Sequence, residues 1–168
     1  DVIYDMNCKY DTPGYGWQLA HGATALTESW QAYGFVSNNH FMLGHLMEWL
    51  FSGSGGIRQK EDSFGFKHIV IKPEPVGDVH DAQVSYESPY GQIVSDWKDN
   101  DKEFIIRVEV PANSKASVYL PSADTKQITE SGVRLEDVPG ISCKQEGNRY
   151  VVATTGSGTY TFKVKKNK

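Results

Sequence analysis

The strongest constraint on the fold comes from residue 66 onwards, where apolar and polar residues alternate in short segments separated by turn sequences. The alternating segments are KHIVIKP, HDAQVSYES, GQIVSDWK, EFIIRVEVP, KASVYLP, KQITES, RYVVATT and GTYTFKVKK. Between them lie SPYG, KDNDKE, PANS, QEGN and GSG, which are rich in residues that favour tight turns. Roughly eight strands with a turn about every eight to twelve residues are typical of an antiparallel β-sandwich. Because no helical segment separates these strands, a βαβ fold is excluded.

A helical segment precedes the strands. The sequence NNHFMLGHLMEWLF, residues 38–51, places apolar side chains at the spacing of one helix face. These side chains are Leu43, Leu46, Met47, Leu50 and Phe51. The N-cap candidates are Ser37, Asn38 and Asn39. Since GSGG ends the helix, we expect a mainly β chain with a short helical part over residues 1–58 and the β-sandwich domain over residues 59–168.

The composition is that of a globular chain with a moderate negative charge. Its 168 residues are 39% apolar and 12% aromatic, which suffices for a hydrophobic core. With 17 basic and 21 acidic residues the formal net charge is −4, so the chain lacks the basic field that binds polyanions. We therefore expect no nucleic-acid partner. No apolar run reaches the roughly 18 residues that span a bilayer, and no membrane segment is expected.

No cofactor is expected either. Cys8 and Cys143 are far apart and form no CxxC pair, and the acidic residues lack the spacing of a calcium loop, so no metal site is predicted. A disulfide between the two cysteines stays open. So does the compartment, for which a periplasmic or extracellular location is favoured over a cytoplasmic one. The first residues lack both the signal-peptide pattern and a starting Met, and the chain is expected to be a fragment of a longer protein.

A single carboxylate, Glu28, lies among small, hydroxylated and aromatic residues in GATALTESW. A hydrophobic core needs aromatic residues but no carboxylate. A sugar-binding cleft uses both, because aromatic faces stack on pyranose C–H surfaces while carboxylates and imidazoles hydrogen-bond the hydroxyl groups. Trp30 beside Glu28, and His40 at the head of the expected helix, suit such a cleft. The residues alone leave a second interpretation open, with an exposed loop acid, a packing Trp and a hydrogen-bonded His.

Seven sequence blocks extend this observation to a family. They are PGYGWQLAHGATALTESW, NNHFMLG, EWLF, GGI, GFKHIVIKPEPVGDV, SYESPYGQIVSDW and VPANSKASVYLP, in this order between residues 10 and 121. The blocks resemble the C-terminal end of the bacterial α-L-rhamnosidases of glycoside hydrolase family 78. In that family an (α/α)6 barrel carries the active site and a C-terminal β-sandwich follows. The resemblance implies that residues 1–58 are the last part of the barrel, whose remainder is then a partner of this chain.

That family hydrolyses terminal α-L-rhamnosyl groups of glycosides or polysaccharides with inversion, using two carboxylic acids. The resemblance implies that Glu28 is the general base, which activates a water molecule on the far face of the sugar. It also makes His40 a ligand of a sugar hydroxyl, with Asn39 and Trp30 as further substrate-binding residues. The chain departs from the family pattern at Thr27, where Trp is usual, and in a shorter loop after Glu28. Both departures bear on substrate preference.

The family's general acid lies in an upstream acidic segment of the barrel that this chain does not contain. Because inverting hydrolysis needs an acid and a base about 6.5–9.5 Å apart, the resemblance implies a glycoside hydrolase in the longer protein and an inactive isolated chain. Glu48, the other acid of this region, is interpreted as structural. Two further classes stay open. One is a noncatalytic carbohydrate-binding module with a platform of Trp97, Tyr86 and Tyr90, and the other is a structural domain that caps the barrel.

Overall fold

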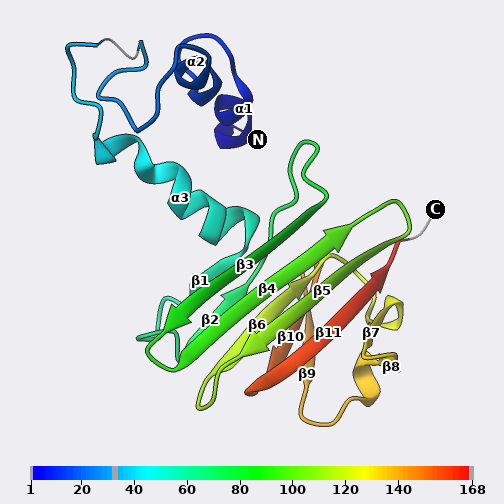
Figure 1. The fold of residues 1–168 in the computed structure, drawn as a ribbon. Coiled ribbons are helices and arrows are strands. Elements are labelled where there is room, and N and C mark those ends of the chain that lie inside the picture. The colour runs from blue at the N-terminus through cyan, green and yellow to red at the C-terminus, as the bar shows by residue number, and fades with distance from the viewer. Residues whose placement is uncertain (1, 32–33, 167–168) are drawn as a thin grey trace. The chain divides into compact units, whose positions relative to one another are not determined.

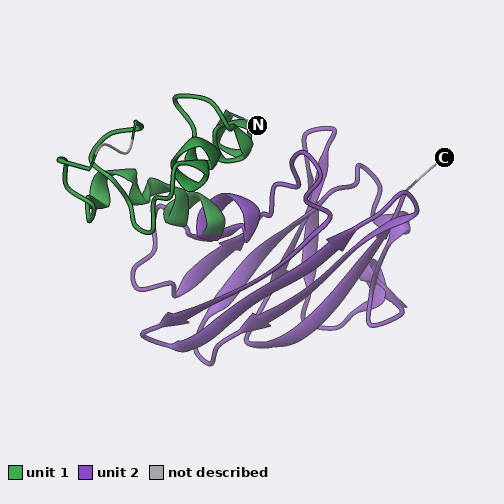
Figure 2. Cartoon of the chain, turned by 45° about the horizontal axis from the view of Figure 1, so that its top comes forward, with its two compact units in different colours: residues 1–50 green, residues 51–168 purple. Residues whose placement is uncertain are grey.

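A computed structural model describes residues 2–31 and 34–166. Contacts along the chain divide it into two compact units, residues 1–50 and residues 51–168 (Figure 2). We call them unit 1 and unit 2 and describe each by itself.

Unit 1 consists of short helical elements joined by irregular loops (Figure 1). The elements are helix α1 (Val2–Cys8), helix α2 (Tyr15–Ala20), the 3-10 turn η1 (Phe41–Gly44) and helix α3 (His45–Trp49). The long loop between α2 and η1 carries all four residues that the sequence proposes as site residues. None of the helical elements that the structure describes is long and apolar enough to cross a membrane.

The helix predicted over residues 38–51 is not one continuous helix. The chain instead forms the turn η1, the α-helix α3 and then a π-helical turn, η2 (Leu50–Ser54). Gly44 lies at the junction of the first two, and glycine is a poor helix former because it loses the most backbone freedom. The N-cap position of η1 is His40, which makes no capping hydrogen bond with its side chain. The three predicted N-cap residues therefore do not cap this element.

Unit 2 is a β-sandwich of two sheets (Figure 1). The first sheet has the order β1-β2-β6-β10-β9, formed by Ile57–Gln59, His68–Ile71, Lys115–Leu120, Tyr150–Thr155 and Ser142–Glu146. The second has the order β3-β4-β5-β11-β7-β8, formed by Asp81–Ser88, Gly91–Asp99, Glu103–Val110, Gly158–Lys165, Ile128–Glu130 and Val133–Arg134. Two 3-10 turns, η3 (Thr125–Gln127) and η4 (Leu135–Asp137), flank β7 and β8. The predicted mainly β sandwich with a short helical part before it is confirmed.

One strand pair departs from the antiparallel pattern. Strands β2 and β6 run parallel, with Ile69 opposite Ala116 and Ile71 opposite Val118. Parallel neighbours need a long crossover, and here the crossover is the meander β3-β4-β5 in the other sheet. Local alternation predicts strands but carries no information on such a distant pairing.

The core lies between the two sheets and follows the alternation of the strands. In β5 every second side chain is buried, from Phe104 to Val110. Ile57 of β1 is already part of this core, because β1 pairs with β2. The boundary expected after residue 58 separates the barrel of the complete protein from the sandwich domain, and it stays a prediction.

Trp97 of β4 is the largest fully buried side chain of the sandwich. Its ring packs against Phe104, with ring centroids 6.1 Å apart. The indole Nε1 donates a hydrogen bond of 2.8 Å to the carbonyl oxygen of Ser54, in the π-helical turn η2. A buried indole N–H needs such a partner. The interpretation of Trp97 as part of a sugar-binding platform is therefore wrong, because no part of its ring is open to a ligand.

The stability of unit 2 is expected to fall as the pH drops through the titration of His68. Its Nε2 lies 2.8 Å from Ser117 Oγ, across the parallel pair β2-β6. Burial lowers the pKa of His68 below 6.5, and Lys115 and Lys60 lower it further, whereas Asp62 opposes them. The unfolded chain then takes up the proton at a higher pH than the folded chain does, so acid favours unfolding. Urea midpoints at about pH 7.5 and pH 5.5 should show the loss.

The substitution His68→Gln serves as the control for this pH dependence. Glutamine keeps a polar group for Ser117 but does not titrate, so the variant should lose less stability between the two pH values than the wild type does. An equal loss in both proteins would assign the pH dependence to other groups.

Candidate active site

Two segments of unit 1 pair through their backbones and bring the predicted site residues into one loop. The Glu28 N–H donates to the Ser37 carbonyl oxygen at 2.8 Å, and the His40 N–H donates to the Leu26 carbonyl oxygen at 2.8 Å. These bonds run in opposite directions between residues 26–28 and 37–40, as in a short hairpin. Glu28 and His40, which are distant in the sequence, therefore come from adjacent segments.

Glu28 is exposed to solvent. Its Oε2 accepts a hydrogen bond of 3.2 Å from the backbone N–H of Ser37. With the bond from its own N–H, Glu28 is joined to Ser37 by two hydrogen bonds. A carboxylate held in this way stays open to water on its remaining side, which is what a general base requires.

A buried network lies on the other side of the same turn. The Gln18 side chain is 4% exposed and that of Thr27 is 1% exposed. Gln18 Nε2 donates to Thr27 Oγ1 at 2.7 Å and to the Ser29 carbonyl oxygen at 3.2 Å. Thr27 Oγ1 donates in turn to the same Ser29 carbonyl at 2.6 Å. Thr27, where the sequence departs from the family pattern, is thus an internal anchor of the turn. Gln18 was not predicted as a functional residue, because it lies in a helix that is too short to show a pattern.

Trp30 is half-buried and is held by helix α2. Its ring makes an edge-to-face contact with Tyr15, with centroids 5.1 Å apart. The Tyr15 hydroxyl donates a hydrogen bond of 2.6 Å to the Leu43 carbonyl oxygen. Burial raises the pKa of the Tyr15 phenol, so this donor keeps its proton. These contacts give Trp30 a packing function, and they fix its ring where one part remains exposed.

His40 and Asn39 lie just before η1, near the surface. The His40 ring is half-buried and stacks on Phe41, with ring centroids 6.3 Å apart. His40 Nε2 lies 3.3 Å from the sulfur of Met42. The Asn39 N–H donates to Ser37 Oγ at 3.4 Å, which leaves the exposed Asn39 side chain out of this bond. Both side chains are therefore accessible to a polar ligand.

Glu48 of α3 is exposed and lies beyond this loop in the sequence, after the turn η1. The described parts of the chain contain no group of three or more His, Cys, Asp and Glu side chains that could hold a metal ion. Cys8 and Cys143 are both free thiols. The loop thus offers a carboxylate, an imidazole and an amide group for chemistry.

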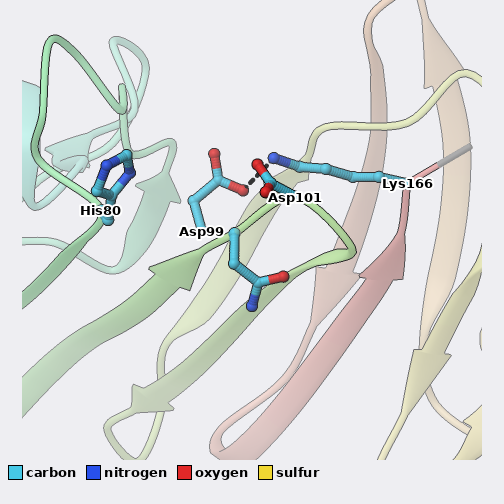
Figure 3. Close-up of a pocket in the computed structure, with 5 residues that line it drawn as sticks. His80, Asp99, Asp101 and Lys166 are labelled. Carbon is cyan, nitrogen blue, oxygen red and sulfur yellow. Dashed lines mark ion pairs between the residues drawn. The ribbon is translucent and has the colours of Figure 1, made fainter. Parts of the chain in front are cut away.

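The sandwich has a polar hollow of about 410 Å³, which Figure 3 shows. It is lined by His80, Asp99, Asn100, Asp101 and Lys166. The Asp99 carboxylate forms an ion pair of 2.5 Å with the Lys166 ammonium group (Figure 3). No Trp, Tyr or Phe is among the described residues that line this hollow, so it lacks the aromatic face of a sugar site. None of the predicted site residues lies in it.

Tyr86 and Tyr90, two residues of the proposed sugar-binding platform, differ from the third, Trp97, in their exposure to solvent. Tyr86 and Tyr90 are 38% and 37% exposed, whereas Trp97 is fully buried. Tyr86 packs on Phe66, with centroids 4.7 Å apart, and on Phe51 at 6.4 Å. Without an exposed Trp97 the three rings do not form a common surface for a sugar.

Comparison with known proteins gives one consistent family. Residues 1–53 match the bacterial alpha-L-rhamnosidase 6 hairpin glycosidase domain, and residues 56–134 match the bacterial alpha-L-rhamnosidase C-terminal domain. An alpha-L-rhamnosidase of Formosa agariphila is 25% identical over 98% of the chain, and one of Streptomyces avermitilis is 27% identical over 98%. The chain spans only 19% and 16% of the lengths of these two relatives.

Solved structures agree with this result. The structure of alpha-L-rhamnosidase from Dictyoglumus thermophilum superposes on 97% of the chain with a TM-score of 0.83 and 28% identity, and the chain covers 18% of it. The Streptomyces avermitilis alpha-L-rhamnosidase complexed with L-rhamnose has the same fold over 98% of the chain, with a TM-score of 0.82 and 24% identity, and the chain covers 16% of it. In sequence and in fold the chain thus matches the bacterial alpha-L-rhamnosidases, over a segment of the six-hairpin glycosidase domain and the C-terminal domain that follows it.

Proposed function

We propose that the chain is the C-terminal part of an inverting α-L-rhamnosidase, a glycoside hydrolase that removes terminal α-L-rhamnosyl groups from glycosides or polysaccharides. The order of the two matched domains supports this, because a glycosidase domain comes directly before the C-terminal domain. The names of the relatives support it as well. By the complete enzyme we mean this chain together with the rest of its catalytic barrel.

One observation carries the assignment of Glu28 as the general base. Its carboxylate is exposed on a turn whose two neighbouring residues, Thr27 and Ser29, are anchored by buried and partly buried hydrogen bonds. A base in an inverting glycosidase must reach a water molecule and must keep a fixed position while it removes a proton. The turn provides access on one side and a rigid support on the other.

The general acid is assigned to the rest of the barrel. Inversion requires a second carboxyl group on the opposite face of the sugar, about 6.5–9.5 Å from the base. One carboxylate cannot serve on both faces. Since the chain spans between 16% and 19% of the curated relatives' lengths, most of their catalytic barrel corresponds to sequence outside it.

His40, Asn39 and Trp30 are proposed as substrate-binding residues. The accessible imidazole and amide can donate to and accept from sugar hydroxyl groups. Trp30, whose ring contacts Tyr15, offers a partly exposed aromatic side chain two residues after Glu28. A rhamnosyl group is thereby the proposed ligand of this loop.

Unit 1 also has the surface expected of a partial barrel. A largely apolar hollow of about 440 Å³ is lined by residues that include Leu19, Leu26 and Leu46. Leu19 is 70% exposed, and Trp17 Nε1 is buried with no hydrogen-bond partner among the described residues. Exposed apolar area and an unpaired buried donor both favour a contact with further protein. The remainder of the barrel is the proposed partner.

The isolated chain is expected to be inactive, in contrast to the complete enzyme. With an aryl α-L-rhamnoside as substrate, the 168-residue chain should release aryl alcohol no faster than buffer does, because the acid that protonates the leaving oxygen is assigned to the rest of the barrel. The complete enzyme should hydrolyse the same substrate. Turnover by the isolated chain that disappears in its Glu28→Gln variant would overturn the proposal.

A further inference from the structure

We propose that Gln18 and Thr27 are positioning residues that hold Glu28 in place for the reaction. This inference rests on the proposed function, because it assumes that Glu28 is the base. It assigns a role to two buried polar residues that lie in different elements, helix α2 and the loop after it.

The hydrogen bonds determine the orientation of both side chains. Thr27 Oγ1 has one proton, which it donates to the Ser29 carbonyl, so it can only accept from Gln18. The Gln18 amide must therefore point its Nε2 group toward the turn, where its two protons reach Thr27 Oγ1 and the Ser29 carbonyl. All three donor protons of the two groups are used.

The network binds the residues on both sides of Glu28, Thr27 and Ser29. Thr27 is held through its side chain and Ser29 through its carbonyl oxygen, at distances from 2.6 to 3.2 Å. Glu28 lies between them and points outward, and its own N–H is bonded to Ser37. A rotation of the Glu28 backbone that moved Thr27 or Ser29 would disturb these bonds, which are costly to lose because they are buried or partly buried.

Gln18 is itself fixed through its backbone. Its carbonyl oxygen accepts from the Ala23 N–H at 2.9 Å and from the His21 N–H at 3.2 Å, at the end of α2. The Gln18 side-chain amide therefore links helix α2 to the turn that carries Glu28. By contrast, the hydrogen bond from the Ser37 N–H to the Glu28 carboxylate is exposed, so water competes for both of its partners. The buried network therefore makes the larger contribution to the position of Glu28.

The substitutions Thr27→Val and Gln18→Met test this in the complete enzyme. Valine keeps the shape of threonine without the hydroxyl group, and methionine keeps the length of glutamine without the N–H donors. A base displaced by about 1 Å loses rate, so we expect kcat to fall about 10- to 100-fold while KM changes less than about threefold. Thr27→Ser, which retains the hydroxyl, should keep kcat within about threefold of the wild type.

Trp97→Phe is the control for lost stability, because it removes the buried hydrogen bond from the indole to the Ser54 carbonyl oxygen in unit 2, outside the proposed site, and keeps an aromatic ring. It should lower the melting temperature without lowering kcat. A Thr27→Val enzyme with wild-type kcat at a temperature where it remains folded would overturn the inference.

The proposed function can fail separately from this inference. If Glu28→Gln retained full activity, Glu28 would not be the base. The exchange rate of the Glu28 amide hydrogen would then still report on the network, since it should rise in Thr27→Val but not in Thr27→Ser. If Glu28→Gln is inactive and neither kcat nor this exchange rate responds to Thr27→Val, only the positioning role is wrong.

Discussion

Replacing Glu28 by Gln in the complete enzyme should lower kcat by about 10²–10⁴-fold. Glutamine has nearly the same shape and keeps one acceptor oxygen for the Ser37 N–H, so folding and sugar binding should change little. What it lacks is the basic oxygen that takes the proton from water. Initial rates with an aryl α-L-rhamnoside, together with the affinity for L-rhamnose, separate the loss of chemistry from a loss of binding.

Glu48→Gln provides the matched control for this substitution. Glu48 is exposed on α3 and is interpreted as structural, so the same change of charge there should leave kcat close to that of the wild type. A full rate for Glu28→Gln, or an equal loss for both variants, would remove Glu28 from the mechanism.

Replacing Trp97 by Ala should destabilise the sandwich by about 3–5 kcal/mol. The substitution opens a cavity beside Phe104 in the core, because Trp97 is fully buried. It also removes the donor that pairs with the Ser54 carbonyl oxygen. Urea denaturation of the chain, followed by circular dichroism of the β-sheets, measures the loss of unfolding free energy.

Trp97→Phe separates packing from hydrogen bonding. Phenylalanine fills most of the same volume but leaves the Ser54 carbonyl without its indole partner, and we expect a smaller loss of about 1–3 kcal/mol. If Trp97→Ala lowered the free energy of unfolding no more than a surface substitution does, the side chain would have to be exposed in solution. Trp97 could then belong to a sugar-binding platform after all.

The alternation of the sequence predicted the sandwich because each strand has one face in the core. Strand β5 shows this most clearly, with EFIIRVEV alternating between half-buried and buried positions. The sequence segment KQITES was less informative, since only Ile128–Glu130 forms a strand and the turn η3 precedes it. The parallel pairing of β2 with β6 could not be predicted, because it depends on where the chain returns after three strands of the other sheet.

The helical part was predicted less well for a physical reason. The apolar spacing of residues 38–51 is real, yet Met47 is 56% exposed and Leu50 is 38% exposed. Tertiary packing stabilises an amphipathic helix more than its intrinsic propensity does. In the described structure α3 comprises only His45–Trp49, with turns of other types on both sides.

The candidate site was predicted from a resemblance rather than from a pattern of the residues. GATALTESW indicated Glu28, and NNHF indicated Asn39 and His40. Nothing in the sequence indicated Gln18, because its hydrogen bond to Thr27 joins a helix to an irregular loop and follows no fixed spacing. The fold determines which residues hold a functional side chain in position, and these residues can be identified only in the structure.

The most direct test of Glu28 as the base of an inverting enzyme is the configuration of the product that its Gln variant forms with azide. Azide is a small anion that can occupy the place of the attacking water and needs no proton removed. We expect azide to restore turnover of an aryl α-L-rhamnoside by Glu28→Gln, and NMR of the anomeric centre to show the inverted rhamnosyl azide. A rhamnosyl azide of retained configuration, or a Glu28→Gln enzyme that needs no azide for full activity, would contradict this account.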